Sequence, residues 1–412
     1  MEFEARCRRL VPNLARELDG TRFHTCDVAA PAVLSSWTSA HLALGLRHLD
    51  PAAAAAELRS LYALCQRDNG LLAAERVVGD RERALRTAEV GPIFGEDNRS
   101  LLISPPIAAF AAARMARTNG AAFRDLLECA TREIDAIWGE RLPPDTPLPV
   151  ILHPLESGVP RSALYETLVE AEDDDEWRDD SATLFRSAAA CQLDPERALR
   201  AGHPFVIEDP VFCGWLLLAL EECARAWEML GDTNACLKLR IRSEMIADGI
   251  GARLWWDEQE IYTAWNRGRQ SALRAVTAGG LVPAATRTLL HEGTSKRAID
   301  RHLRPAASAL WSSRGVFHTP PRSAERDERD AHAQRPDAAS PVAHFWAHLV
   351  LARADRPVDA RVARTQLEEL ALSRGFLDRY EMRPDETIAL ADDASFWPLL
   401  ALEMRELERA SV

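Results

Sequence analysis

The sequence is poor in lysine and holds no concentrated run of positive charge. Lys238 and Lys296 are its only lysines among 412 residues, so arginine carries nearly all of the positive charge. This scarcity argues against an enzyme built on a lysine Schiff base, and no glycine-rich phosphate-binding motif ending in Gly-Lys is present. A net charge of −13 also argues against a nucleic-acid partner, because phosphate binding needs a concentrated basic surface.

Membrane, disulfide and metal signals are missing as well. The most apolar runs, such as residues 214–220, fall far short of the roughly 18 residues that a transmembrane helix needs. The amino terminus is charged and lacks the apolar segment of a secretory signal. The eight cysteines form no C-x-x-C pair, which predicts buried free thiols and a cytoplasmic location. The acidic run 170–175 does not have the spacing of a calcium loop. We expect the protein to use no metal and no cofactor.

Helical periodicity dominates what is present, in a chain of globular composition. Apolar residues recur at spacings of three and four, and good helix formers fill the remaining positions. Alternating strand patterns are scarce, and the best candidate for an extended segment is 147–153. We therefore predict an all-α fold. The expected helices are 40–48, 51–65, 106–118, 122–138, 211–230, 235–254, 344–353, 360–373 and 395–408.

Residues 314–342 form the longest polar segment and are rich in Pro, Arg and Asp. One interpretation is a linker between two domains. The other is a functional loop over one end of a single helical domain, because long loops in compact domains are often lids or binding loops.

Several stretches carry candidate functional residues. The sequence HPLESG at 153–158 places His153 and Glu156 within one turn, as capping groups of a short helix or as part of a polar pocket. Trp37 stands next to a loop, where tryptophan can belong to the core or stack on a sugar ring. Glu386 lies in a Pro-Asp-Glu turn, either as an exposed turn carboxylate or as a functional base.

These stretches occur in an order that resembles one family. The matching motifs are 37–41, 48–51, 104–106, 153–162, 209–213, 254–262, 314–316, 340–343, 375–376 and 395–397. They resemble the six-hairpin, (α/α)6-barrel glycoside hydrolases, above all bacterial mannosylglycerate and glucosylglycerate hydrolases and the processing α-glucosidases. The resemblance covers roughly residues 30–405 and implies a single barrel over 1–412, to which the long polar loop belongs.

The resemblance also implies an inverting mechanism with two carboxylic residues. In the family, an aspartate of the loop that matches 153–162 is the general acid, and a glutamate near the carboxyl terminus is the general base. Here the position of the acid is Pro160, which cannot transfer a proton, and Glu386 takes the place of the base. His153 and Glu156 survive from the loop, so the candidate catalytic residues are Glu386, Glu156 and His153.

Three residues that contact the sugar in the family are replaced in this sequence. Thr38 stands where the family has an aspartate after the first tryptophan. Ser104 stands where it has a glutamine before two prolines, and Ala343 where it has a later tryptophan. The pocket implied by the resemblance is therefore less polar and less crowded. The candidate substrate-binding residues are Trp37, Thr38, His41, Ser104, Asp209 and Trp397.

Three functions remain open on the sequence alone. The first is a divergent glycosidase that takes its acid from Glu156, Glu166 or Asp173. The second is a barrel repurposed for cyclisation, isomerisation or elimination in specialised metabolism. The third is an inactive ligand-binding protein. We expect the first, with a small-molecule substrate, no membrane or nucleic-acid partner, and a monomeric state.

Overall fold

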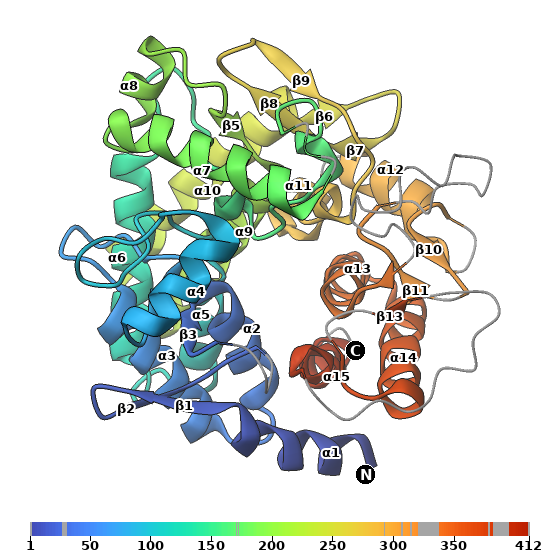
Figure 1. Cartoon of the computed structure of the whole chain (residues 1–412). Helices are drawn as coiled ribbons and strands as arrows, with labels where there is room; N and C mark the ends of the chain where they lie inside the picture. The colour runs from blue at the N-terminus through green and yellow to red at the C-terminus, as the bar shows by residue number, and fades with distance from the viewer. Residues whose placement is uncertain are drawn as a thin grey trace.

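The chain is mostly helical in the computed structural model (Figure 1). The structure describes residues 2–26, 31–169, 171, 173–291, 293–305, 308–313, 315–319, 338–377, 380–381 and 395–410. Within these ranges no helix is long and apolar enough to cross a membrane.

An inner layer of helices closes into a ring. Its members are α2 (Ser36–Leu46), α5 (Ile107–Thr118), α9 (Pro210–Met229), the turns η4 (Ala278–Leu281) and η5 (Pro283–Ala285), α13 (Pro341–Arg353) and α15 (Leu400–Ala410). α2 packs on α5, α5 on α9, α9 on η5, η5 on α13, α13 on α15, and α15 on α2. Nearly every residue of α2, α9 and α13 is buried, as expected for helices that are covered on all sides.

An outer helix follows most of the inner ones and packs against it. These outer helices are α3 (Pro51–Cys65), α6 (Arg124–Glu140), α10 (Thr233–Arg253) and α14 (Pro357–Arg374). They pair with α2, α5, α9 and α13 respectively, and α12 (Gly293–His302) covers η5. The outer helix α6 buries mainly one face, with most of its apolar residues packed inward and its charged residues, except buried Glu133, toward solvent.

The expected helices are confirmed to within a few residues, with the last one beginning as the turn η7 (Trp397–Leu399). Segment 147–153 is not a strand, and its one bridge joins Ile151 to Ile207. The periodicity missed the more polar helices α1 (Glu2–Leu10), α4 (Asp80–Val90) and α7 (Asp174–Ala190). All eight cysteines are free thiols, as expected; six of them are buried, and Cys26 and Cys129 are partly exposed.

Short antiparallel strands occupy the connections between helices. The pairs are β1 (Ala15–Leu18) with β2 (Thr21–His24), β3 (Val33–Ser35) with β4 (Glu75–Val77), β6 (Trp255–Trp256) with β7 (Ile261–Tyr262), and β10 (Trp311–Ser312) with β11 (Gly315–Val316). β8 (Ala264–Asn266) lies between β5 (Ile207–Glu208) and β9 (Ser271–Leu273). β12 (Ala338–Ala339) pairs with β13 (Tyr380–Glu381), so the end of the polar segment 314–342 lies beside residues 380–381.

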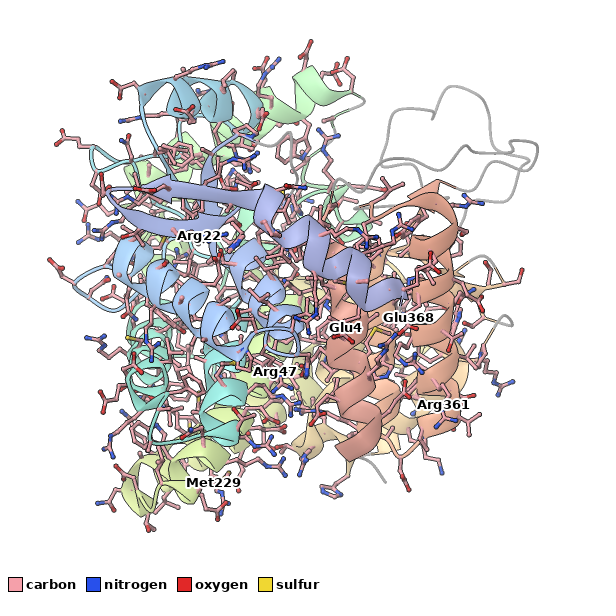
Figure 2. The ribbon with its side chains drawn as sticks, turned by 90° about the horizontal axis from the view of Figure 1, so that it is seen from below. Glu4, Arg22, Arg47, Met229, Arg361 and Glu368 are labelled. Atoms are coloured by element: carbon pink, nitrogen blue, oxygen red, sulfur yellow. The ribbon has the colours of Figure 1, made fainter. Side chains whose placement is uncertain are left out.

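Two buried carboxylates inside the ring are neutralised by arginines. Glu403 at the start of α15 accepts hydrogen bonds from Arg47 (2.7 Å) and Arg114 (3.0 Å), which come from the α2 and α5 sides of the ring. Glu222 on α9 pairs with Arg353 of α13 (2.6 Å). The pairs of Glu403 link α15 to α2 and α5, and the pair of Glu222 links α9 to α13, at a depth where an unpaired charge would be strongly unfavourable. Arg47 is labelled in Figure 2.

The buried carboxyl group of Glu133 has no cationic partner among the described residues, and it should make stability depend on pH. Glu133 of α6 accepts a hydrogen bond from the Tyr62 hydroxyl (2.9 Å), and burial raises its pKa to about 8 from the ordinary 4.5. Because the folded-state pKa is the higher one, the stability contribution is fully present below about pH 4.5 and is lost as pH rises toward 8.

Replacing Glu133 by Gln should therefore stabilise the protein in alkaline buffer only. We expect Glu133→Gln to raise the free energy of unfolding at about pH 8.5 by on the order of 3 kcal/mol and to change it little at about pH 5. Denaturant unfolding at the two pH values measures this. The control is Glu140→Gln, an exposed glutamate on the same helix. An equal effect at both pH values would contradict the prediction.

Candidate functional site

The loop His153–Pro154–Leu155–Glu156–Ser157–Gly158 forms a single tight turn. His153 caps the 3-10 turn η2 (Pro154–Ser157), because its Nδ1 accepts a hydrogen bond from the Leu155 amide (3.2 Å). Pro154 suits the first position of such a turn, where no amide donor is needed. Gly158 ends the turn with φ at +76°, a conformation that favours glycine. The sequence of this loop therefore dictates its shape locally.

Glu156 is fully buried and its carboxylate is saturated. Arg141 binds it in a bidentate manner, with Nη2 donating to Oε1 (2.6 Å) and Nη1 donating to Oε2 (3.2 Å). The amides of Ile103 (3.1 Å) and Leu152 (2.7 Å) donate to the same two oxygens. Proton transfer by Glu156 would require these bonds to break. Its contacts are those of a residue that positions the loop.

His153 is equally engaged. Its Nε2 donates to the Ser181 carbonyl oxygen (2.9 Å), while Nδ1 accepts from Leu155. Burial lowers the pKa of His153 to about 4, so the ring is neutral at physiological pH. As with Glu156, the role that geometry supports is to hold the loop in place.

Four aromatic side chains from three inner elements form what we call the aromatic wall: Trp37, His41, Trp346 and Trp397. The ring centroids of Trp37 and His41 are 4.5 Å apart, those of His41 and Trp397 are 5.0 Å apart, and those of Trp37 and Trp346 are 6.3 Å apart. Trp37 and Trp397 are partly exposed, whereas His41 and Trp346 are buried. The structure thus brings together three of the predicted binding residues, Trp37, His41 and Trp397.

His41 is neutral and holds the wall together. Its Nδ1 donates to the Trp37 carbonyl oxygen (2.7 Å), and burial lowers its pKa to about 3. Its Nε2 has no hydrogen-bond partner among the described residues. In this tautomer Nε2 is an acceptor.

The aromatic wall contacts the 153–158 loop and also His318. A Cβ atom on Gly158 would come within 2.7 Å of the Trp37 ring, so only glycine lets the 153–158 loop approach Trp37 this closely. On the other side, His318 lies with its ring centroid 5.5 Å from that of Trp346. Trp397 follows the segment that carries Glu386. Glu386 itself lies outside the described residues.

Asp209 is linked to the 153–158 loop through Tyr165. It caps α9, with Oδ1 accepting from the Phe212 amide (2.8 Å), and its Oδ2 accepts from the Tyr165 hydroxyl (2.6 Å). Tyr165 also interacts with Ser157 of the loop. Burial raises the pKa of Asp209 to about 6. Both of its oxygens are engaged, so a direct contact with substrate would need a rearrangement.

The replaced sugar contacts are small and buried. Thr38 and Ser104 are each 7% exposed, and Ala343 lies at 0% exposure in α13. The Ser104 hydroxyl has no hydrogen-bond partner among the described residues and follows Ile103, whose amide binds Glu156. Pro160 is partly exposed just after the loop.

Two other proposed sources of a general acid are exposed to solvent. Asp173 caps α7, with Oδ1 accepting from the amides of Asp175 and Glu176, and Glu166 is exposed. Within the described ranges, no three or more His, Cys, Asp or Glu side chains gather in a way that could hold a metal ion.

Sequence reasoning missed several residues of this region. Arg141 carries no motif of its own, and only its distance from Glu156 in space reveals the pair. Tyr165 was missed for the same reason. Trp346 could have been found, because it stands on a strongly apolar helix three residues after Ala343, the last residue of the matching motif 340–343.

The ring of inner helices with its outer partners is a fold shared with solved helical glycoside hydrolases, and here the aromatic wall lies beside the 153–158 loop. The model of the mannosylglycerate hydrolase MGH1-like glycoside hydrolase domain matches residues 32–335. The chain belongs to this family.

Known relatives agree with this assignment. A mannosylglycerate hydrolase of Rubrobacter radiotolerans is 26% identical over 267 residues, which cover 56% of this chain and 59% of that protein. The chain thus matches about three fifths of this curated relative's length.

Solved structures share the fold. The GH63 mannosylglycerate hydrolase of Thermus thermophilus in complex with Tris and D-glycerate superposes with a TM-score of 0.80 at 18% identity, covering 98% of this chain and 100% of that one. The neutral trehalase of Saccharomyces cerevisiae gives 0.55 at 14% identity, with 95% and 76% covered. At these identities the matches establish the fold alone.

Proposed function

We propose that the protein is a divergent glycoside hydrolase that acts on a small molecule and works without the usual general acid. In this proposal Glu386 activates the water, and Pro160 stands where the acid would be. The aromatic wall carries the proposal, because partly exposed Trp37 and Trp397 offer flat surfaces on which a sugar ring can stack, directly beside the 153–158 loop.

We further propose that the helices form an (α/α)6 barrel and that the whole chain is one domain. The closed order of inner helices and their outer partners supports this. The free, largely buried thiols are in keeping with the proposed cytoplasmic location. A monomeric state is part of the proposal.

His153 and Glu156 act in this scheme by positioning. They fix the 153–158 loop, and Gly158 in turn lets the loop pack on Trp37. The surface on which a substrate would lie is therefore held in place before binding, which is a large part of what an enzyme contributes to a reaction.

The substitution Glu386→Gln tests this assignment. We expect it to remove most of the hydrolysis of an activated glycoside and to leave thermal stability unchanged, because the amide keeps the shape of the side chain but cannot accept the proton. Glu369→Gln, an exposed glutamate on α14, is the control. Full activity in Glu386→Gln would refute the role of Glu386 as the base.

A second candidate function is supported by the small side chains. Thr38, Ser104 and Ala343 replace the family's larger sugar contacts, and this favours a less polar substrate and a non-hydrolytic acid–base reaction such as an isomerisation or elimination. An inactive binding protein is the third possibility. Product analysis separates them: the second predicts no sugar release from any glycoside, and the third predicts binding without conversion.

A further inference from the structure

A basic hollow lies on the side of the ring formed by α9, α10 and α11 (Arg287–Leu290). It has a volume of about 330 Å³, and its lining includes Arg225, Arg240, Arg287 and His291 together with Glu221 and Glu244. Several basic groups therefore lie together here, although the net charge of the chain is −13.

Arg225 is only weakly compensated in this hollow. Its nearest carboxylate is that of Glu222, at 4.0 Å, and this carboxylate is already bound by Arg353 at 2.6 Å and by Arg117. The Arg225 side chain is 28% exposed. Burial lowers its pKa, and the neighbouring Arg117 and Arg353 lower it further against the effect of Glu222. A partly buried guanidinium beside two others would gain from an additional negative charge.

Among the acidic residues of the lining, Glu221 attracts Arg225, but its carboxylate is already engaged by other groups. Glu221 accepts at Oε1 from the Thr288 amide and hydroxyl (3.0 Å each) and at Oε2 from Arg353 (3.2 Å), so both of its oxygens are taken. Glu244 is exposed. Arg287 is exposed as well and adds a second cation, while Arg240 pairs with Glu228 (2.7 Å).

We propose that this hollow binds a small oxyanion, either a phosphate or the carboxylate of a metabolite, through the guanidinium groups of Arg225 and Arg287. Arginine suits such ligands because its planar group donates two parallel hydrogen bonds. No residue of the aromatic wall lines the hollow. Along α9, Arg225 lies 16 residues beyond Asp209, which is about 24 Å at the rise of an α-helix. The inference does not depend on the proposed glycosidase activity.

Calorimetric titration with inorganic phosphate tests the site. Ionic strength is held constant with chloride, and acetate is titrated separately to tell a preference for phosphate from one for carboxylate. We expect saturable binding of at least one of the two anions to the unmodified protein. Arg225→Gln and Arg287→Gln should each weaken it at least tenfold, which corresponds to about 1.4 kcal/mol.

The control is Arg22→Gln, an exposed arginine on β2 that lies well apart from Met229, the last residue of α9, in Figure 2. It should bind the anion as the unmodified protein does. Arg225 contributes to a buried network, so if its variant fails to fold, the result with exposed Arg287 decides. The proposal is overturned if neither anion binds, if Arg287→Gln binds with unchanged affinity, or if Arg22→Gln weakens binding equally.

Discussion

Glycosyl fluorides should be hydrolysed while ordinary glycosides stay at or near background. Fluoride leaves without a proton, so a site with a base but no general acid can still cleave α-mannosyl or α-glucosyl fluoride. The lack of a general acid typically costs two to four orders of magnitude, roughly 100- to 10,000-fold, on substrates whose leaving group must be protonated. We therefore expect mannosylglycerate, glucosylglycerate and simple α-glycosides to show little or no turnover in an assay of released sugar.

The structure strengthens this expectation by limiting the candidates for a substitute acid. Glu156 is saturated by Arg141 and two amides, and Asp173 caps a helix in solvent. Neither is free to protonate a leaving group beside the aromatic wall. Robust turnover of any unactivated glycoside would contradict the prediction and would mean that another residue supplies the proton.

Restoring the acid alone should not restore hydrolysis. In Pro160→Asp, the small side chains of Thr38, Ser104 and Ala343 still hold the sugar poorly, and positioning accounts for a large share of the barrier reduction. The combined Thr38→Asp and Pro160→Asp variant has the better chance of gaining activity on activated glycosides. Because proline fixes φ, loop order must be compared in parallel, for instance by amide hydrogen exchange.

The helices could be predicted from the sequence because their apolar spacing is set by burial. α9 shows this well, because every residue of its run GWLLLAL is buried. α1, α4 and α7 were missed because they are rich in charge, and their apolar residues are too few to set a clear period. Their place is decided by tertiary contacts, such as that of α1 with α14, which no local pattern contains.

The sequence predicted which residues come together in the candidate site better than it predicted the role of each residue. The motif order predicted Trp37, His41 and Trp397 as binding residues, and the structure brings their rings into contact. Sequence alone made His153 and Glu156 look like acid–base groups. Their hydrogen bonds instead go to Ser181, Arg141 and backbone amides that lie up to 53 residues away in the chain. Partners so distant in the sequence cannot be predicted from residue spacing.

The same chemical change, glutamate to glutamine, should therefore have opposite consequences at two positions of this protein. Glu386→Gln is expected to alter activity and spare stability. Glu156→Gln removes the charge that compensates buried Arg141, whose side chain is 2% exposed. Breaking a buried ion pair at one partner typically costs about 3–5 kcal/mol, so the free energy of unfolding should fall by that much.

A double variant distinguishes the loss of charge compensation from a general loss of packing. Arg141→Met together with Glu156→Gln removes the uncompensated cation, while the glutamine oxygen can still accept from the Leu152 or Ile103 amide. It should be more stable than Glu156→Gln alone in denaturant unfolding. Amide exchange at residues 152–158 should rise in the single variant, because the loop loses its anchor. If Glu156→Gln unfolds within about 1 kcal/mol of the unmodified protein, the buried pair does not hold this loop, and Glu156 returns as a candidate for proton transfer.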